Sequence, residues 1–383
     1  MKILVLGAGR MGLGAAYDLA HNSPDVRSVT VADIDAERAR AVVATVGPDK
    51  LTAVAVDVAD ADAVVALMRG HDAALSCVTY HHNLQLARCA IEARTNFCDL
   101  GGNNTIVDAE LALDTEARAA DINIIPDCGL APGMVSVLAA HGAARFDELA
   151  ALHIRVGGLP QQPKPPLNYQ IVFSVEGLIN EYVERARVIR DGQIIEIESM
   201  TETETLEFPA PFGTMEAFQT SGGTSTLPDT FAGRLRTLDY KTIRYPGHCA
   251  QFKLLIELGL AASEEVELDG VRLRPRRLLG EMLTRHLPAD EPDVVLIRLE
   301  FHGRMNKQTQ TLRYDIIDSF DARTGLSAMM RTTAFPASII AQTMARGGTT
   351  ERGARPQERC IPPAEFVAAL AARDIKITES ISG

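Results

Sequence analysis

Three glycines near the N-terminus have the spacing that a phosphate-binding turn requires. Gly7, Gly9 and Gly12 follow a short apolar segment and precede a helical pattern. The first glycine permits a sharp bend, the second lets the backbone approach a pyrophosphate, and the third lets the helix pack closely. The helix start, at Arg10 and Met11, offers unpaired N–H groups and partial positive charge to the phosphates. The pattern predicts a dinucleotide-binding turn; a glycine-rich turn in an ordinary α/β unit is the alternative.

Asp33 indicates which dinucleotide binds. It ends a second apolar segment, at about the spacing from the glycines that the dinucleotide fingerprint requires. A carboxylate there accepts hydrogen bonds from the ribose hydroxyls and repels a 2′-phosphate, and the next residues, Ile34 and Asp35, supply no cation. We therefore expect NAD, with NADP less favoured, while FAD stays open on the glycine pattern alone.

Residues that follow the other apolar segments are further candidates, because ligands of open α/β sheets bind at the carboxyl ends of the strands. Asp57 and Val58 follow the third segment, where they are expected to flank the adenine, although a helix cap explains Asp57 equally well. The loop 76–82 follows the fourth segment and is expected to run toward the nicotinamide. Tyr80 and His81 in this loop are candidates for the active-site wall.

Two acids, Asp99 and Asp127, follow the fifth and sixth apolar segments. Carboxyl groups on neighbouring strand ends of a nucleotide-binding sheet are placed to meet an amine or to take a proton. Each also has an ordinary explanation as a cap or turn former. The next residue, Cys128, is expected to be a buried small side chain, because hydride transfer needs no nucleophile.

The second half of the chain offers polar side chains for a substrate. Glu176 lies in a segment with helix-start character, and Thr224 lies in a small-residue loop rich in hydroxyl groups. Arg244 and His248 flank a sharp turn, where the guanidinium could grip a carboxylate with two donors. On spacing alone, a surface ion pair for Arg244 and a capping or core position for His248 are the stronger explanations.

The order of patterns predicts an α/β protein with two domains. Strand and helix patterns alternate up to residue 128, which predicts a doubly wound parallel sheet of the Rossmann type. Residues 129–330 mostly alternate apolar and polar side chains, including a strand at 169–175, and predict an inserted α+β domain with a mostly antiparallel sheet. Residues 331–383 turn helical again and are expected to pack on the first domain and complete it.

Composition limits the partners. The 383 residues are 46% apolar and 23% charged, with a net charge of −12, which argues against nucleic acid. No apolar segment has the length of a membrane span, and the first residues already read as a strand. The six cysteines show no metal-ligand spacing. We expect a cytoplasmic protein with a small-molecule substrate, no metal and no membrane contact.

Together these motifs resemble the saccharopine dehydrogenase family, in the glutamate-forming group that includes lysine 6-dehydrogenase. The resemblance extends over essentially the whole chain and rests on segments 7–12, 80–81, 99–102, 127–133, 174–182 and 242–248. It implies an NAD(P)-dependent oxidoreductase that acts on a CH–NH2 or CH–NH donor of an amino acid. It also implies a second domain that binds substrate and forms a homodimer.

The resemblance also implies residue roles. Gly7 to Gly12 hold the pyrophosphate, and the nicotinamide side is lined by Cys77, Val78 and Tyr80. The substrate residues that it implies are Arg244 for the carboxylate, Glu176 or Asp127 for the amine, and Thr224 and His248 nearby. The general acid or base stays open among Tyr80, Asp99 and Asp127.

The residue at position 131 differs between members of this family that act on different substrates. Family members that form saccharopine or carboxynorspermidine tend to carry an acid at this position, so Ala131 favours a simple amino acid. We therefore expect oxidation of L-lysine at its ε carbon, which yields allysine or its cyclic form, ammonia and NADH. The alternative is formation or cleavage of a secondary amine between an amino acid and a carbonyl compound with NAD(P)H. A cofactor-binding regulatory protein is the third hypothesis.

Overall fold

The computed structural model describes residues 1–47 and 49–383, which form two compact units. The first unit is made of Met1–Arg145, Ser225–Thr230 and Met330–Lys376. The second is made of Phe146–Thr224, Phe231–Met329 and Ile377–Gly383. The last residues of the chain, which the sequence assigned to the first domain, thus lie with the second unit.

The first unit is built on a parallel sheet with the strand order β17-β6-β5-β4-β1-β2-β3. Its strands are β1 (Lys2–Leu6), β2 (Ser28–Asp33), β3 (Leu51–Ala55), β4 (Ala73–Ser76), β5 (Asn96–Asp99), β6 (Asn123–Ile125) and β17 (Gly353–Ala354). The order changes direction between β1 and β4, the place where doubly wound sheets bind their ligands. The predicted Rossmann-type sheet is confirmed.

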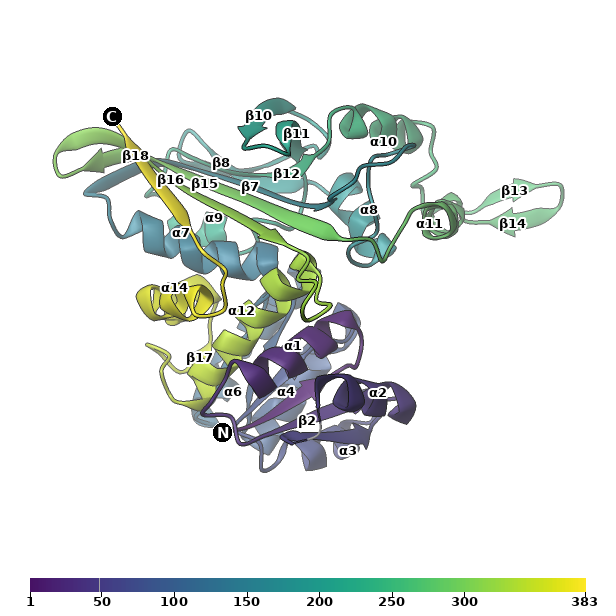
Figure 1. Cartoon of the computed structure of the whole chain (residues 1–383), viewed down its shortest axis with the longest axis vertical. Coiled ribbons are helices and arrows are strands. Elements are labelled where there is room, and N and C mark those ends of the chain that lie inside the picture. The colour runs from purple at the N-terminus through teal and green to yellow at the C-terminus, as the bar shows by residue number, and fades with distance from the viewer. Residues whose placement is uncertain (48) are drawn as a thin grey trace. The chain divides into compact units, whose positions relative to one another are not determined.

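Helices cover both faces of this sheet (Figure 1). They are α1 (Arg10–His21), α2 (Ala36–Val46), α3 (Ala61–Met68), α4 (Asn83–Ala93), α5 (Asn104–Leu111), α6 (Asp114–Ala119), α7 (Val135–Ala143), α13 (Gln357–Cys360), α14 (Pro363–Ala371) and most of α9 (Leu227–Phe231) and α12 (Ala328–Ala345). Two irregular turns complete the unit, η1 (Tyr80–His82) and η2 (Leu130–Met134).

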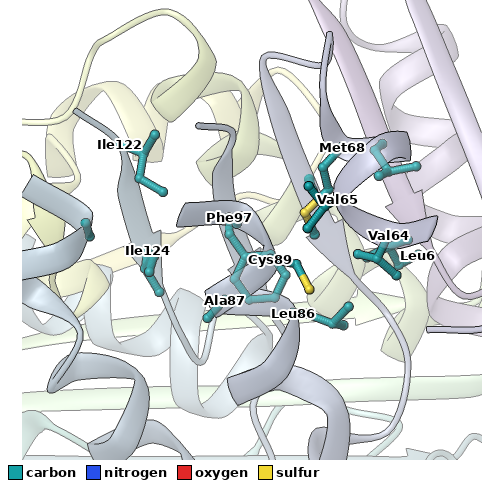
Figure 2. Packing of buried hydrophobic residues seen from close by; sticks show 14 of the residues in the cluster. Leu6, Val64, Val65, Met68, Leu86, Ala87, Cys89, Phe97, Ile122 and Ile124 are labelled. Carbon is teal, nitrogen blue, oxygen red and sulfur yellow. The ribbon is translucent and has the colours of Figure 1, made fainter. Parts of the chain in front are cut away.

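The core of the first unit lies between the strands and helices α3 and α4. Figure 2 shows Leu6, Phe97 and Ile124 of the sheet packed with Val65 and Leu86 of these helices. Each of these side chains is fully or almost fully buried, so the face is continuous across the central strands. Burial of apolar side chains of this size is the main stabilising contribution to the unit.

The second unit contains a mixed sheet with the order β10-β11-β12-β7-β15-β16-β18, to which β8 and β9 add beside β12. Its strands are β7 (Glu148–Pro160), β8 (Ala186–Arg190), β9 (Gln193–Ile197), β10 (Glu204–Phe208), β11 (Gly213–Gln219), β12 (Thr237–Arg244), β15 (Asp293–Met305), β16 (Gln308–Ser319) and β18 (Thr378–Ser382). Only β7 and β12 pair in parallel among these described strands, so the predicted α+β unit with a mostly antiparallel sheet is confirmed.

Three helices and a small hairpin accompany this sheet: α8 (Val175–Val183), α10 (His248–Glu257), α11 (Pro275–His286) and the strands β13 (Val266–Leu268) and β14 (Val271–Leu273). The hairpin extends beyond α11 (Figure 1). The strand predicted at 169–175 is wrong. Its apolar alternation reflects Tyr169 and Val172, which are buried from an irregular segment, and Ser174 then caps α8.

A buried ion pair attaches the C-terminal part of the first unit to its first helix. Arg373 donates from Nε to Asp18 Oδ1 at 2.6 Å and from Nη2 to Asp18 Oδ2 at 3.0 Å. Nη2 also donates to Ser23 Oγ at 3.1 Å. Residues 372–376, directly after α14, therefore belong structurally to the dinucleotide-binding fold. Separately, no helix in the described ranges is both long and apolar enough to span a membrane.

We predict that Arg373→Ala lowers the free energy of unfolding of the first unit by about 3–5 kcal/mol, because the Asp18 carboxyl group is left buried without its partner. Urea titration followed by circular dichroism measures this change. Arg40→Ala, which removes an exposed pair with Glu37, is the control and should leave the transition unchanged. Equal effects of the two substitutions would contradict this role of Arg373.

Candidate active site

The glycine turn has the shape that a dinucleotide needs. Gly7 adopts a φ of +101°, and a Cβ on it would lie 2.9 Å from the carbonyl carbon of Cys77. A Cβ on Gly12 would lie 1.8 Å from Gly7 O, so α1 can approach the turn only with glycine there. A Cβ on Gly9 meets no atom within 4 Å. The turn is therefore tightly packed on the protein side and open at Gly9, where the pyrophosphate is expected.

Asp33 connects the glycine turn after β1 to the turn after β2 through hydrogen bonds of its carboxylate. Its Oδ2 accepts the N–H of Ala8 at 2.7 Å and its Oδ1 accepts the N–H of Asp35 at 2.9 Å. The carboxylate stays half-buried, so its remaining lone pairs can reach a ribose. Arg38, the cation nearest in sequence, pairs with Asp35 at 3.5 Å. The residues present fit a dinucleotide cofactor.

The other residues predicted for the cofactor lie around this turn in different ways. Cys77 donates its N–H to Leu6 O at 2.7 Å, and Val78 packs against the core directly behind Gly7. Burial raises the pKa of the Cys77 thiol, which therefore stays neutral.

Val58, one of the two residues predicted to flank the adenine, also packs against this core. Asp57 is exposed and accepts the N–H of Ala59 at 2.9 Å, as a turn former does. Both Arg10 and Met11 open α1, and Arg10 is exposed.

Carboxyl groups gather at the ends of β5 and β6. Asp99 Oδ1 accepts the N–H of Gly101 at 2.6 Å and the N–H of Asp127 at 3.3 Å. A Cβ on Gly101 would lie 1.6 Å from Asp127 Oδ1, and a Cβ on Gly102 would lie 3.2 Å from the Tyr80 ring. The structure thus brings together Tyr80, Asp99 and Asp127, the three candidates for the general acid or base.

A third carboxyl group, Glu110 on α5, joins this cluster and was missed by the sequence analysis. Glu110 and Asp99 are both fully buried. Among residues 1–47 and 49–383, no amide or hydroxyl donor reaches either Glu110 oxygen or Asp99 Oδ2. Burial raises the pKa of both groups, and the charge of Asp99 raises that of Glu110 further. We conclude that the pair holds one proton between its two carboxyl groups.

Asp127 is a different kind of carboxyl group. Its φ of +60° lies in the left-handed region, and Ser225 donates its hydroxyl to Oδ2. Burial and the charge of Asp99 raise the pKa of Asp127 to about 7, while the Ser225 hydrogen bond opposes the rise. Asp127 therefore exchanges a proton near neutral pH, which is the property that a general base requires.

The loop 225–230 contacts a further buried acid of the first unit, Glu358 on α13. Thr226 and Thr230 donate their hydroxyls to Glu358 Oε1 at 2.9 and 2.7 Å. Gln357, next to this acid, donates its side-chain amide to Asp127 O at 3.0 Å. Burial raises the pKa of Glu358. Neither Ser225 nor Glu358 carries a signal in the sequence, because each is distant from Asp127 along the chain.

In the second unit, Arg244 is held by neutral groups. Its Nε donates to Tyr182 Oη at 2.9 Å and its Nη1 to Ile243 O at 2.9 Å. Tyr182 Oη lies 3.0 Å from His248 Nε2, and His248 Nδ1 lies 3.0 Å from Leu167 O. Burial and the Arg244 charge lower the pKa of His248 to about 3, so its one proton is on Nδ1 and Nε2 accepts from Tyr182. His248 thus orients Tyr182, which orients Arg244.

Neither Glu176 nor Thr224, the remaining predicted substrate residues of this unit, forms a hydrogen bond or ion pair with Arg244 in the described ranges. Glu176 is exposed in the first turn of α8, and Thr224 is buried with its hydroxyl donated to Arg187 O at 3.0 Å. Burial raises the pKa of Glu181, the residue before Tyr182 on α8, to about 7, and the charge of Arg244 opposes the rise. No group of three or more His, Cys, Asp or Glu side chains in the described ranges could hold a metal ion.

Two family models match the chain. The saccharopine dehydrogenase NADP binding domain matches residues 3–125, and the saccharopine dehydrogenase C-terminal domain matches residues 129–375. The chain belongs to the saccharopine dehydrogenase family. This confirms the resemblance found in the sequence and, at the level of the family, the expected class of oxidoreductases acting on CH–NH donors.

Among curated members of the saccharopine dehydrogenase family, two fungal proteins are similar to the chain. The saccharopine dehydrogenase [NADP(+), L-glutamate-forming] of Saccharomyces cerevisiae is 25% identical over 277 residues, and that of Pyricularia oryzae is 24% identical over 277 residues. Each match covers 70% of this chain and 60% of the relative. The chain thus spans 60% of the length of these relatives, which are named as saccharopine dehydrogenases and not as lysine 6-dehydrogenases.

Solved structures show the same fold. The apo saccharopine dehydrogenase (L-Glu forming) of Saccharomyces cerevisiae has a TM-score of 0.81 at 19% identity, with both chains covered completely. A homospermidine synthase of Legionella pneumophila in complex with NAD has a TM-score of 0.68 at 12% identity, covering 100% of this chain and 91% of that one. At these identities the likeness concerns the fold of the family alone.

The glycine turn gives a matched pair of variants. We predict that Gly9→Ala keeps the thermal stability of the protein and weakens NADH binding at least about tenfold, because its methyl group enters the open side of the turn. Gly12→Ala should lower both stability and binding, because its methyl group meets Gly7 O. Differential scanning calorimetry and NADH fluorescence titration measure the two effects. Unchanged NADH affinity in Gly9→Ala would remove this assignment of the pyrophosphate site.

Proposed function

We propose that this saccharopine dehydrogenase family member oxidises an amine-bearing carbon of an amino acid with a nicotinamide dinucleotide. The observation that carries the proposal is the buried carboxyl cluster of Asp99, Glu110 and Asp127 at the strand ends of a dinucleotide-binding sheet. Oxidation of an amine and hydrolysis of the resulting imine release protons, which such groups accept. Bound NAD or NADP would supply the hydride acceptor.

Two amino acids, saccharopine and L-lysine, are the candidate substrates. Saccharopine, a secondary amine, is supported by the names of the fungal relatives, and with water and NAD(P)+ it would give allysine, L-glutamate, NAD(P)H and a proton. L-lysine is supported by Ala131, where family members that form the larger products tend to carry an acid. With water and NAD(P)+, L-lysine would give allysine, ammonium, NAD(P)H and a proton. Both reactions oxidise the ε carbon of a lysine moiety.

Asp127 is the residue that we assign as general base. The carboxyl group of Asp99 already has partners within the protein and is therefore not the base. Its Oδ1 accepts two backbone N–H groups, and Asp99 and Glu110 act on one another's pKa. Tyr80 is half-buried and packs on His81 with 4.0 Å between ring centroids. A neutral phenol is a weaker base at pH 7 than a carboxyl group that is half-ionised there. Asp127 would take the proton of the attacking water, and Tyr80 would form part of the wall.

For the cofactor, we propose a preference for NAD over NADP. The turn after β2 carries Asp33 and Asp35, and the nearby cations Arg38 and Arg40 are paired with Asp35 and Glu37. A 2′-phosphate would meet uncompensated negative charge in such a turn. The name of the matching family model and those of the fungal relatives support NADP, so the choice needs a direct measurement.

The test of the function is a set of four assays on the purified protein. NADH and NADPH formation are followed by absorbance with L-lysine and with saccharopine, each with NAD+ and with NADP+. The proposal predicts turnover with at least one amine. Turnover with saccharopine only would select the secondary amine, turnover with L-lysine only would select the primary amine, and no turnover with either would sink the proposal.

We predict that Asp33→Asn reduces NADH affinity about 10- to 100-fold and NADPH affinity much less, because an amide keeps the acceptor oxygen but loses the charge. Fluorescence titration of both dinucleotides in the wild type and the variant gives the ratio of affinities. An unchanged ratio would show that Asp33 does not select between them.

The pH profile tests Asp127. Because the base must be ionised, we expect kcat/KM for amine oxidation to rise with a midpoint of about pH 7 and to be lost below it. Ser225→Ala removes a hydrogen bond that favours the ionised carboxylate, so it should move the midpoint to higher pH. Asp127→Asn should lower kcat about 100- to 10,000-fold while keeping NADH affinity. A midpoint that does not move in Ser225→Ala would assign the titration to another group.

A further inference from the structure

One loop of the first unit connects two buried acids, Asp127 and Glu358. Ser225 donates its hydroxyl to Asp127 Oδ2, and the next residue, Thr226, donates its hydroxyl to Glu358 Oε1 at 2.9 Å. We infer that Glu358 is a positioning residue, which holds the loop 225–230 in place so that Ser225 donates to Asp127. The inference rests on the proposed function for the role of Asp127 as general base. Neither the motifs nor the family resemblance indicated Glu358.

Glu358 holds the loop at two points, one helical turn apart. Thr226 and Thr230 donate their hydroxyls to the same oxygen, Glu358 Oε1, at 2.9 and 2.7 Å. The N–H of Thr230 also donates to Thr226 O at 3.0 Å, which closes the turn between the two hydroxyls. Two donors on one acceptor fix both the position and the rotation of this turn. The backbone of Ser225, directly before it, is therefore placed by Glu358.

Ser225 adopts a backbone conformation that needs such support. Its φ of +41° lies in the left-handed region, which residues other than glycine adopt mostly where the surrounding structure holds them. Without the anchor, the backbone would relax to an ordinary conformation and the hydroxyl would leave Asp127. Since both side chains are almost fully buried, bulk solvent would not replace the lost hydrogen bond.

The helix that carries Glu358 also reaches the backbone of Asp127. Gln357, the first residue of α13, is fully buried and donates its side-chain amide to Asp127 O at 3.0 Å. The same short helix thus contacts the backbone of Asp127 directly and its carboxyl group through Thr226 and Ser225. These five residues form a closed ring of hydrogen bonds and chain, and all of them belong to the first unit.

Stability alone does not explain an acid at position 358. Glu358 is buried, and its Oε2 meets no donor within residues 1–47 and 49–383. A buried carboxyl group with an unsatisfied oxygen is costly to fold around, and an apolar side chain would fill the same place at a lower cost. The two threonine hydroxyls on its other oxygen instead favour a role in holding the loop.

The position of Ser225 matters because its hydrogen bond favours the ionised form of the base. Burial and the charge of Asp99 raise the pKa of Asp127, and the Ser225 hydroxyl is the largest of the contributions that oppose this rise. The ionisable neighbours that act on Asp127 include Asp99 at the end of β5, Glu110 on α5 and Glu358 on α13, and all three are acids. Release of Ser225 would therefore keep Asp127 protonated to a higher pH and leave less base at neutral pH.

The experiment measures the pKa of Asp127 without turnover. Carbon-13 NMR of the full-length protein with labelled aspartate carboxyl carbons gives its titration curve, which is assigned by its absence in Asp127→Asn. Ser225→Ala is introduced into the wild type, into Glu358→Gln and into Glu358→Ala. The quantity compared is the shift that Ser225→Ala causes within each background, so the change in pKa that follows from loss of the Glu358 charge cancels.

We expect Ser225→Ala to raise the pKa of Asp127 by about one pH unit in the wild type. The shift should persist in Glu358→Gln, because the amide oxygen still accepts both threonine hydroxyls. In Glu358→Ala the anchor is absent, so Ser225→Ala should leave the pKa unchanged. A role of Glu358 in stability alone would not make the effect of Ser225→Ala depend on the residue at position 358.

A second set of variants keeps Glu358 and serves if Glu358→Ala fails to fold. Thr226→Val combined with Thr230→Val removes both hydroxyls and should abolish the Ser225→Ala shift, whereas Thr226→Ser combined with Thr230→Ser should retain it. Asp229→Asn, at an exposed position of the same loop, is the matched control and should also retain the shift.

Three results would overturn the positioning role of Glu358. They are a Ser225→Ala shift of equal size in Glu358→Ala and in the wild type, loss of the shift in Glu358→Gln, and the absence of any shift in the wild type. Because the titration needs no turnover, a failure of the dehydrogenase assays leaves its result readable on its own.

Discussion

The buried carboxyl group of Asp99 is the constraint on which the catalytic end of the first unit depends. One of its oxygens accepts the N–H groups of Gly101 and Asp127 and so joins the loops after β5 and β6. No donor of the described residues reaches the other oxygen, and Asp99 and Glu110 act on one another's pKa. Since two adjacent buried carboxylates cannot both be ionised, this pair stays singly charged, and its charge adds to the rise in the pKa of Asp127 that burial causes. Asp99 thus fixes the position of the base and contributes to its proton affinity.

Buried charged side chains of the second unit have two kinds of partner, oppositely charged groups or neutral ones. Arg155 and Asp239 are both buried and paired at 2.7 Å, and His153 adds a contact to Asp239 at 2.8 Å, so these charges compensate one another within the sheet. Arg244, also buried, is instead held by the neutral groups Tyr182 and Ile243 O. A buried cation without a counter-ion is costly to fold around. Its presence is reasonable where a ligand supplies the missing negative charge, and this contrast is our reason for treating Arg244 as functional.

How much the sequence could predict depends on how local each feature is. The glycine turn and Asp33 were predictable, because a turn, a strand end and a helix start are fixed by neighbouring residues. Glu110 was not, because an acid on a short helix has the pattern of an exposed residue, and only the packing of α5 buries it against Asp99. Ser225 was missed for a similar reason, since it approaches Asp127 from a loop 98 residues away in sequence. The strand predicted at 169–175 failed because burial in an irregular segment imitates strand alternation.

The acid cluster also suggests how amine binding and proton transfer are coupled. The neighbourhood of Asp127 contains the charge of the Asp99–Glu110 pair and that of Glu358, and these charges raise its pKa. A positively charged amine brought near this cluster would oppose them and lower that pKa. Asp127 would then lose its proton when the substrate binds, and become a base at the step where water attacks the imine. Burial alone would also raise the pKa of Asp127, and the neighbouring acids add the part of the rise that a positively charged substrate can oppose.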